Sequence, residues 1–362
     1  MNDFEALVSL NLIPQIGSVR LGNLLEVFKK PEAIFKASRN DLTAVVGDSI
    51  SENIVSFDRR LLEKDLVLAK KSGLKIITCF DQDYPQLLKE IPGAPIVLYV
   101  LGNIIEQDNL AIGIVGSRRA SLYGLSCAEK FASQLSAQGI AIVSGMARGV
   151  DTYAHRGALK AKGGRTIAVM GSGFNHIYPA ENADLAKQIA SSGAVISEFP
   201  MDAQPLPQNF PRRNRLISGL SLGVLITEAA RNSGALITAD FALEQGREVF
   251  ALPGRIDSAG SMGTNDLIKQ GAKIITCCDD ILEELSLTTV KMAKITPIEN
   301  VLAGVCEKEE NRLYEHITQQ PIAIDDLIEK SALSSSQVLN LILKLQFKKL
   351  IKVLPGKQYA RN

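Results

Sequence analysis

The sequence predicts an α/β protein whose central part is a doubly wound, Rossmann-like parallel sheet. Three observations support this prediction. Short, continuously apolar runs recur between about residues 74 and 285, amphipathic stretches of helical length separate them, and glycine-containing turns follow many of the runs. Runs that are apolar throughout are typical of strands buried on both faces, and their alternation with helices indicates parallel pairing. Ligands of such sheets bind at the carboxyl ends of the strands.

Seven apolar runs are the expected strands, at residues 111–115, 140–143, 166–170, 194–196, 222–227, 248–252 and 273–276. Four amphipathic stretches between them are expected to be helices, at residues 123–138, 150–161, 181–190 and 235–245. We therefore place the sheet domain at residues 73–286.

The N-terminal segment, residues 1–72, is expected to form a small helical domain. Two similar turns, at residues 12–17 and 42–47, each end in glycine and lead into helices at 21–28 and 50–57. This spacing fits a tandem helix-hairpin-helix, in which glycine lets backbone N–H groups approach a DNA phosphate. It also fits a SAM-like bundle that only packs on the next domain. The lack of a basic cluster after either glycine favours the bundle.

The C-terminal part is expected to be a linker at residues 287–304 and a winged helix-turn-helix at 305–362. Helices are predicted at residues 311–318, 325–330 and 336–349, the last capped by Ser334 or Ser335, and a β-hairpin at 351–360. The third helix and the wing carry Lys344, Lys348, Lys349, Lys352 and Lys357. These lysines suit DNA contact, but winged helices also bind proteins, and both interpretations stay open.

Composition narrows the class of protein. Apolar residues make up 46% of the chain and charged residues 22%, as in ordinary globular proteins. The start of the chain lacks a basic segment and no apolar run reaches the ~18 residues that a membrane span needs, so we expect a cytoplasmic protein without membrane association. The five cysteines are scattered without zinc spacing, and no metal or cofactor is expected.

Arginine is concentrated in the middle of the chain. Residues 118–255 hold 11 of the 17 arginines, together with four lysines and ten acidic residues, and so carry a net charge of +5 although the whole chain has only +1. The planar guanidinium pairs with phosphate in a bidentate manner. This distribution predicts an anion-binding surface on the sheet domain, although surface arginines of a soluble domain are the simpler alternative.

Glycine-rich turns follow strand after strand, and small residues there expose backbone N–H groups to an anion. The candidate binding residues on these turns are Gly116, Ser117, Arg118, Arg119, Ser144, Gly145, Arg148, Gly149, Ser233, Gly234 and Thr238. A further turn, Pro253-Gly254-Arg255, follows the run at 248–252. Several such turns on one sheet edge predict a long anion-binding rim, larger than one nucleotide requires.

A proline-rich loop at residues 199–215 adds an aromatic residue and three arginines. The candidates here are Phe210, Arg212, Arg213, Asn214 and Arg215. An aromatic ring for base stacking beside charges for phosphates suits single-stranded nucleic acid. Phe210 could instead lie in the core, and the arginines could form salt bridges at a helix start. Because cations are unfavourable at a helix N-terminus, we expect a bound anion to offset the three charges.

Motifs for other functions are missing or weak. Neither the dinucleotide-binding GxGxxG nor the Walker GxxxxGK[ST] motif occurs, so the sequence does not support dinucleotide binding or ATP hydrolysis. Asp151 and His155 lie one helical turn apart, as an acid–base pair would. Ser144 with these two residues does not form a nucleophile elbow, and we expect structural hydrogen bonds instead.

Four separated motifs, in this order, resemble the DNA-processing protein A (DprA/Smf) family. They are Gly116-Ser117-Arg118, Ser144-Gly145-x-Ala147-x-Gly149-Val150-Asp151-x-x-Ala154-His155, Phe210-Pro211-x-Arg213-Asn214-Arg215, and Gly246-Arg247-x-Val249-Phe250-Ala251-x-Pro253-Gly254. The resemblance spans the middle domain, and the flanking modules are similar to those of many members. One departure is that Pro207 and Gln208 stand where many members have Lys or Arg.

The resemblance implies an extended Rossmann-like domain that forms a homodimer, binds single-stranded DNA cooperatively and transfers it to the RecA recombinase. In naturally transformable bacteria this protects incoming DNA and loads RecA onto it. By matching position, Ser117, Arg118, the 144–149 turn, Phe210 and the arginines after it would line the DNA pocket. The expected protein is a binding protein and not an enzyme.

Two alternatives remain at this point. A nucleotide or phosphoribosyl hydrolase resembling the lysine-decarboxylase-like proteins would also present glycine turns to phosphate, with Glu228 as its acid. Its PGGxGT-type loop is not contiguous here, because Pro253-Gly254 and Gly263-Thr264 are separated. A purely structural adaptor for RecA would leave the arginine-rich rim unexplained.

Overall fold

The computed structural model describes residues 1–292, 313–318, 322–331, 338, 341–342, 345, 350–354 and 358–361. The chain divides into two compact units, Met1–Thr289 and Val290–Asn362. Within the described residues, no helix combines the length and apolar character that crossing a membrane requires.

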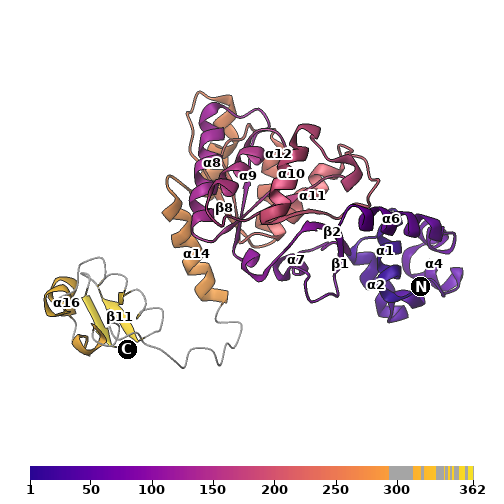
Figure 1. Ribbon diagram of the computed structural model, residues 1–362, viewed down its shortest axis with the longest axis horizontal. Helices are drawn as coiled ribbons and strands as arrows, with labels where there is room; N and C mark the ends of the chain where they lie inside the picture. Colours follow the sequence, from indigo (N-terminus) through magenta and orange to yellow (C-terminus); the bar gives the residue numbers. More distant parts are fainter. Residues whose placement is uncertain are drawn as a thin grey trace. The chain divides into compact units, whose positions relative to one another are not determined.

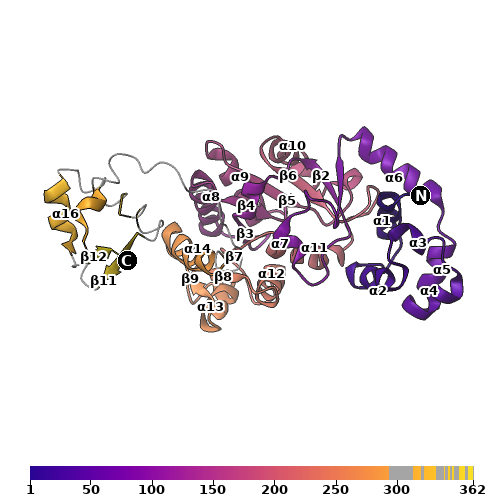
Figure 2. The same ribbon diagram turned by 90° about the horizontal axis from the view of Figure 1, so that it is seen from below.

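The first unit begins with six helices, seen around the N-terminus in Figures 1 and 2. They are α1 (Asp3–Leu12), α2 (Ser18–Phe28), α3 (Pro31–Ile34), α4 (Arg39–Val46), α5 (Asp48–Val55) and α6 (Arg59–Lys71). The first predicted helix–turn–helix pair is α1–α2. In the second pair, α4–α5, residues 42–46 of the predicted turn belong to α4, and only Gly47 separates the two helices. Gly47 joins the second pair with a φ of 82°, a conformation that favours glycine.

The helices pack against the sheet that follows them. Their apolar residues share one core with Tyr99 and Met201 of the sheet region. Asp65 of α6 is buried, and its carboxylate accepts hydrogen bonds from the Tyr99 hydroxyl (2.5 Å) and the Met201 N–H (2.9 Å). This docking matches the packing role expected of a helical bundle.

A mostly parallel sheet of nine strands forms the centre of this unit. In spatial order the strands are β1 (Lys75–Thr78), β2 (Val97–Gly102), β6 (Ala194–Ser197), β5 (Thr166–Val169), β4 (Ala141–Ser144), β3 (Ala111–Val115), β7 (Gly223–Ile226), β8 (Glu248–Ala251) and β9 (Lys273–Ile274). Strands β3 to β9 are parallel, which confirms the predicted doubly wound sheet. Strands β1 and β2 were not among the predicted strands, and they extend the sheet antiparallel beyond β6.

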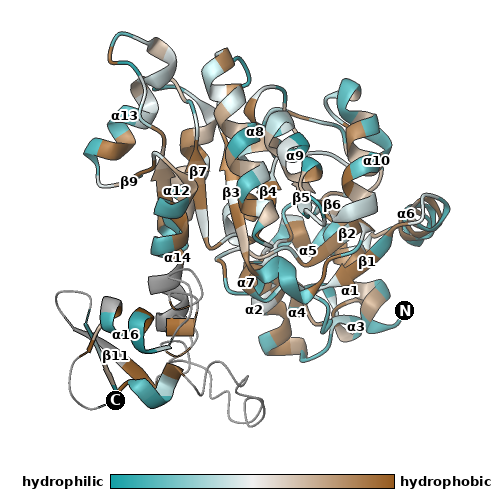
Figure 3. Ribbon diagram, turned by 60° about the vertical axis from the view of Figure 1, so that its left-hand side comes forward, coloured by the Kyte–Doolittle hydropathy of each residue, from teal (hydrophilic) through white to brown (hydrophobic). Residues whose placement is uncertain are grey.

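Helices cover both faces of the sheet (Figures 2 and 3). Alternate side chains of the strands point to opposite faces; Ile112 and Ile114 pack in one core, and Ala111 and Val115 in the other. The first face carries α8 (Leu122–Ala137), α9 (Val150–Lys160), α10 (Ala183–Ser192) and α14 (Cys278–Met292). The second carries α7 (Gln86–Lys89), α11 (Asn209–Gly219), α12 (Gly234–Glu244) and α13 (Met262–Lys269). Short 3-10 turns lie at Glu106–Asn109, Phe174–His176, Ala180–Asn182 and Ala259–Ser261.

The second unit is described only in part. Strands β10 (Ile322–Ala323), β11 (Ile351–Leu354) and β12 (Gln358–Arg361) form a sheet in the order β10-β12-β11, beside α16 (Ile324–Ser331). Strands β11 and β12 are the predicted hairpin. Residues 287–292, which were predicted to begin the linker, instead continue α14. The rest of the predicted linker, the Ser334 and Ser335 caps, Lys344, Lys348, Lys349 and Lys357 lie outside the described residues, as does the side chain of Lys352.

The Asp65 contacts predict a stability effect. Asp65→Ala leaves the Tyr99 hydroxyl and the Met201 N–H buried without their acceptor, so the free energy of unfolding should fall by about 2 kcal/mol. Urea denaturation measures this change. Lys64→Ala, on the same helix but at an exposed ion pair with Asp202, is the control and should unfold like the wild type. Equal stability of all three proteins would contradict this role of Asp65.

Candidate nucleic-acid interface

A cleft of about 650 Å³ opens at the carboxyl ends of β3 and β7. The chain order reverses between these two strands, because β4 to β6 follow on one side of β3 and β7 to β9 on the other. Connections leave such a point towards opposite faces and open a crevice there. The cleft is lined by Val115, Gly116, Ser117, Arg118, Arg119, Ala147, Asp151, Tyr178, Pro205, Pro207, Phe210, Pro211, Arg213, Asn214, Ile217, Ser233, Gly234, Ala235, Ile237 and Thr238.

Ten of the sixteen predicted binding residues line this cleft. A smaller adjoining cavity contains two more, Gly145 and Arg148, beside Arg118, Tyr178 and Phe210. The other four, Ser144, Gly149, Arg212 and Arg215, line neither cavity. The tertiary structure therefore brings most of the predicted rim together and gives the remaining residues other contacts.

The turn after β3 forms one wall of the cleft. A side chain at Gly116 would meet Val150 at 2.7 Å and the carbonyl of Glu228 at 2.9 Å, so only glycine fits there. The Ser117 N–H donates to the same carbonyl at 2.7 Å, which fixes the turn between β3 and β7. Arg118 and Arg119 then extend from it as exposed side chains.

The turn after β4 supports that wall from behind. Gly149 has a φ of 76°, and a Cβ there would lie 2.4 Å from the Ser117 carbonyl. The buried Ser144 hydroxyl donates to the Ile114 carbonyl at 2.6 Å. These two predicted binding residues thus hold neighbouring turns together instead of facing the cleft.

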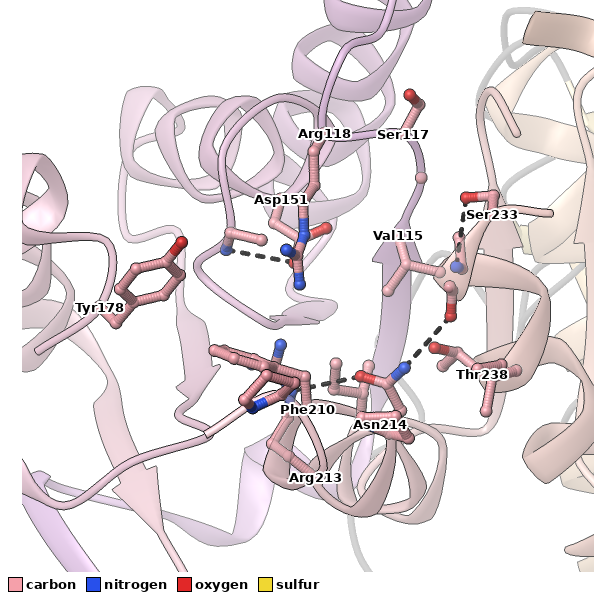
Figure 4. Close-up of a pocket in the computed structure, with 18 of the residues that line it drawn as sticks. Val115, Ser117, Arg118, Asp151, Tyr178, Phe210, Arg213, Asn214, Ser233 and Thr238 are labelled. Atoms are coloured by element: carbon pink, nitrogen blue, oxygen red, sulfur yellow. Dashed lines mark hydrogen bonds between the residues drawn. The ribbon is translucent and has the colours of Figure 1, made fainter. Parts of the chain in front are cut away.

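Phe210 belongs to a helix and not to the loop that the sequence suggested. Helix α11 begins at Asn209, and Phe210 is half-buried at its first turn. The Phe210 ring packs 5.5 Å from the Tyr178 ring, and the guanidinium of Arg118 lies 5.2 Å from its centroid (Figure 4). Gly171 makes room for the ring, because a Cβ there would lie 2.9 Å from it. The result is an aromatic pair with an adjacent cation among the residues that line the cleft.

Arg213 lies under the cleft and is only 3% exposed. Its guanidinium donates to the carbonyl oxygens of Gly145 (2.5 Å) and Val169, which end two neighbouring strands. Burial lowers the pKa of Arg213 to about 10, so the side chain remains charged at neutral pH. It holds the floor of the cleft in place and leaves little of its surface to a ligand.

Asp151 brings a negative charge into this positive site. The carboxylate accepts a hydrogen bond from the Ala147 N–H at 3.3 Å and points into the cleft near Arg118 (Figure 4). Burial raises the pKa of Asp151 to about 6, although the charges of Arg213 and Arg118 lower it. The charge on the cleft therefore changes near neutral pH.

Arg212 and Arg215 turn away from the cleft, which corrects the expectation that a bound anion offsets all three arginines. Both donate to Glu198, at 3.0 and 2.6 Å, and that carboxylate is 2% exposed. Arg212 also lies over the Phe199 ring. The three arginines of α11 therefore have partners within the protein. The buried Glu198 carboxylate pairs with Arg212 and Arg215, and the two strand-end carbonyls accept hydrogen bonds from Arg213.

The other wall of the cleft is the first turn of α12. The Ser233 hydroxyl caps this helix by accepting from the Ala235 N–H, and Gly234 leaves the backbone open. Asn214, in the second turn of α11, donates to the Gly234 carbonyl at 3.2 Å and so joins α11 to the start of α12. The first turns of both helices line the cleft. The positive ends of the two helix dipoles favour an anion on this side of the cleft.

Tyr178 is the main lining residue that the sequence analysis missed. It lies after the Phe174–His176 turn, is 39% exposed, and meets Phe210 from a segment distant in sequence. In the sequence, Tyr178 stands before a proline and after a glycine-containing turn, and this is the feature that could have identified it. Arg148, which was predicted, forms a bidentate pair with Glu181 at 2.6 and 2.7 Å, both side chains being exposed.

His155 and Glu228 have structural contacts. The buried His155 bonds to Thr166 at 2.7 Å, and burial lowers its pKa to about 3. The Glu228 carboxylate accepts from the N–H and hydroxyl of Ser121 at the start of α8. Glu228 does not line the large cleft, so the geometry gives no support to its role as the acid of a hydrolase.

Comparison with known proteins gives consistent matches. Residues 75–286 match the family model of DNA recombination-mediator protein A, and residues 303–357 match the DprA winged helix domain. Protein Smf of Escherichia coli (strain K12) is 45% identical over 236 residues, which cover 65% of this chain and 63% of that protein. The match thus spans slightly less than two thirds of the relative.

Two solved structures are similar as well. The X-ray structure of DNA processing protein A from Streptococcus pneumoniae has a TM-score of 0.69 and 34% identity, and the match covers 78% of this chain and 99% of that chain. DNA processing protein A from Helicobacter pylori, described for its single-stranded DNA binding mode, has a TM-score of 0.54 and 31% identity, covering 60% and 98%. Because the family model covers more than half of the chain, this protein belongs to the DNA recombination-mediator protein A family of DNA-processing proteins.

Proposed function

We propose that this DNA-processing protein binds single-stranded DNA in the cleft between β3 and β7. The observation that supports this most is the meeting of two exposed arginines, an aromatic pair and two helix N-termini around one cleft of about 650 Å³. Cations and N–H groups suit phosphates, and aromatic rings suit unpaired bases. A DNA processing protein A with 31% identity is described as binding single-stranded DNA, which supports the same ligand here.

The proposed contacts divide by chemistry. Arg118, Arg119 and the α12 N-terminus at Ser233 and Gly234 bind phosphates, since they are the cationic or N–H-bearing groups of the two walls. Phe210 and Tyr178 stack on bases. The remaining predicted residues that reach the cavities, among them Ser117, Asn214, Thr238, Gly145 and Arg148, are its polar lining.

Single strands are the better ligand because stacking needs a free base face. In a duplex, the base faces are occupied by neighbouring bases, and the half-buried Phe210 ring lies inside a cleft. None of the contacts in this proposal requires a particular base, because every base presents an aromatic face. We therefore expect little sequence preference.

The finer part of the proposal concerns recombination. We infer that the protein forms a homodimer through its middle domain, protects incoming DNA in the cytoplasm and loads RecA onto it during natural transformation. The family membership supports this inference. The outer strand β9 supports the dimer, since Ile274 is 48% exposed at an edge of the nine-stranded sheet.

Substitutions in the cleft test DNA binding. Arg118→Ala should weaken the binding of oligo-dT. It should also make the slope of log K against log salt concentration shallower by about 0.7. Phe210→Ala should cost about 1–3 kcal/mol of binding through lost stacking. Fluorescence anisotropy at several salt concentrations measures both effects.

Arg60→Ala, at an exposed arginine of α6, serves as the control for that experiment. It should bind like the wild type. Wild-type affinity of both cleft variants would place the DNA elsewhere, and a wild-type protein indifferent to oligo-dT at low salt would overturn the proposed function.

The Asp151 charge predicts a pH dependence. Its pKa of about 6 leaves the carboxyl ionised at pH 8 and mostly protonated at pH 5, so acidification removes a negative charge from the cleft. Affinity for oligo-dT should rise several-fold as pH falls from 8 to 5. Asp151→Asn should flatten this profile, and Asp41→Asn, in the N-terminal helices, should not. A profile unchanged by Asp151→Asn would rule out this carboxyl as the cause.

Recombinase loading has its own test. RecA ATPase activity on single-stranded DNA coated with a single-strand-binding protein should start sooner when this protein is present. Phe210→Ala should lose most of that effect, because the DNA must be held before it is transferred. An unchanged lag with the wild-type protein would refute the loading role while leaving DNA binding intact.

A further inference from the structure

We propose that a groove at the carboxyl end of β8 is an additional nucleotide subsite, which receives a base of the strand that occupies the main cleft. This inference rests on the proposed function. The groove measures about 660 Å³, within the ~300–1,000 Å³ typical of ligand pockets, and is lined by Ser121, Tyr123, Pro253, Gly254, Arg255, Ser258 and Ser261. Its lining includes the predicted turn after β8, Pro253-Gly254-Arg255, and no residue of this turn lines the main cleft.

The groove lies along the same edge of the sheet as the main cleft and the small adjoining cavity. Strands β5, β4, β3, β7 and β8 are neighbours in that order, and their carboxyl ends share one edge. The small cavity holds residues that follow β4, the main cleft lies at β3 and β7, and this groove lies at β8. At about 4.8 Å between strands, the edge from β5 to β8 measures roughly 19 Å. That is the length of about five stacked nucleotides at ~3.4 Å each.

One short turn joins the main cleft to the groove. Arg119 lines the cleft and Ser121, two residues later, lines the groove. The Ser121 N–H and hydroxyl are bound to the buried Glu228 at 3.0 and 2.5 Å, which fixes the turn as a ridge between the two spaces. A strand that leaves the cleft beside the exposed Arg119 passes over this ridge.

Tyr123 offers the stacking surface. It stands on the first turn of α8 with 54% of its surface exposed, and its hydroxyl donates to the Pro253 carbonyl at 3.4 Å. That contact joins the ring to the opposite side of the groove. Leu122 and Ile256, adjacent in sequence to the lining residues, are 85% and 92% exposed. Burial of this apolar surface under the face of a base is favourable, because the surface is removed from water.

Charge favours DNA over a protein as the occupant. Arg255 lines the groove and pairs with Asp257 at 2.7 Å, but both side chains are more than half exposed, so the pair is weak and a phosphate can replace the carboxylate. Arg119 provides the second cation on the ridge. A protein partner would contact only the apolar residues of the groove. Its binding would not make use of the position of the groove beside the main cleft.

A length series of oligo-dT tests the subsite. Tyr123→Ala should lower the affinity for dT15 by about tenfold, as expected when one stacked base is lost. It should leave dT3 unaffected, because three nucleotides cover only the main cleft and do not also fill the groove. Tyr123→Phe keeps the ring without the hydroxyl and should bind dT15 within about twofold of the wild type. Thermal melting of the variants checks that each is folded.

Photocrosslinking locates the base directly. In dT15 with single 5-iodo-deoxyuridine substitutions, one position should crosslink to Tyr123 and another to Phe210 or Tyr178, as identified by mass spectrometry. Crosslinks to the main cleft only, together with unchanged dT15 binding by Tyr123→Ala, would overturn the subsite and leave the proposed function intact. Absence of any dT binding by the wild type would overturn both.

Discussion

Arg213 donates hydrogen bonds from beneath the cleft to the carbonyl oxygens of Gly145 and Val169, where β4 and β5 end. A buried guanidinium is costly unless its donors are satisfied, and here the ends of two strands provide the acceptors. The space is so tight that a Cβ on Gly145 would lie 2.5 Å from the guanidinium. This packing sets where the first turn of α11 stands, and with it the position of Phe210.

A second constraint keeps the arginines of α11 apart. Arg212 and Arg215 share the buried Glu198, so they stabilise the helix start while Arg213 supports the strand ends. The exposed positive charge of the cleft then comes from another segment, the Arg118 and Arg119 pair after β3. Arginines that look alike in the sequence thus divide into internal supports and exposed residues that line the cleft.

Much of the site was visible in the sequence because parallel strands end at one edge. That rule alone predicted that the turns at Gly116, Gly145 and Gly234 would lie near one another, and they line two adjoining cavities. The rule says nothing of side-chain direction. Ser144 and Arg215 therefore could not be separated from true lining residues, and Tyr178 could not be paired with Phe210, until the chain was folded.

The sequence by itself determined the architecture, since the apolar runs, the helical periodicity and the glycine turns depend on local chemistry. The tertiary structure alone decided which side chains face the cleft, because that depends on contacts between segments far apart in the chain. Glu198 and Arg215 are 17 residues apart, and Glu228 and Ser121 are 107 residues apart. A guanidinium or carboxylate pairs with the group that folding brings close to it, and the local sequence does not show which group that is.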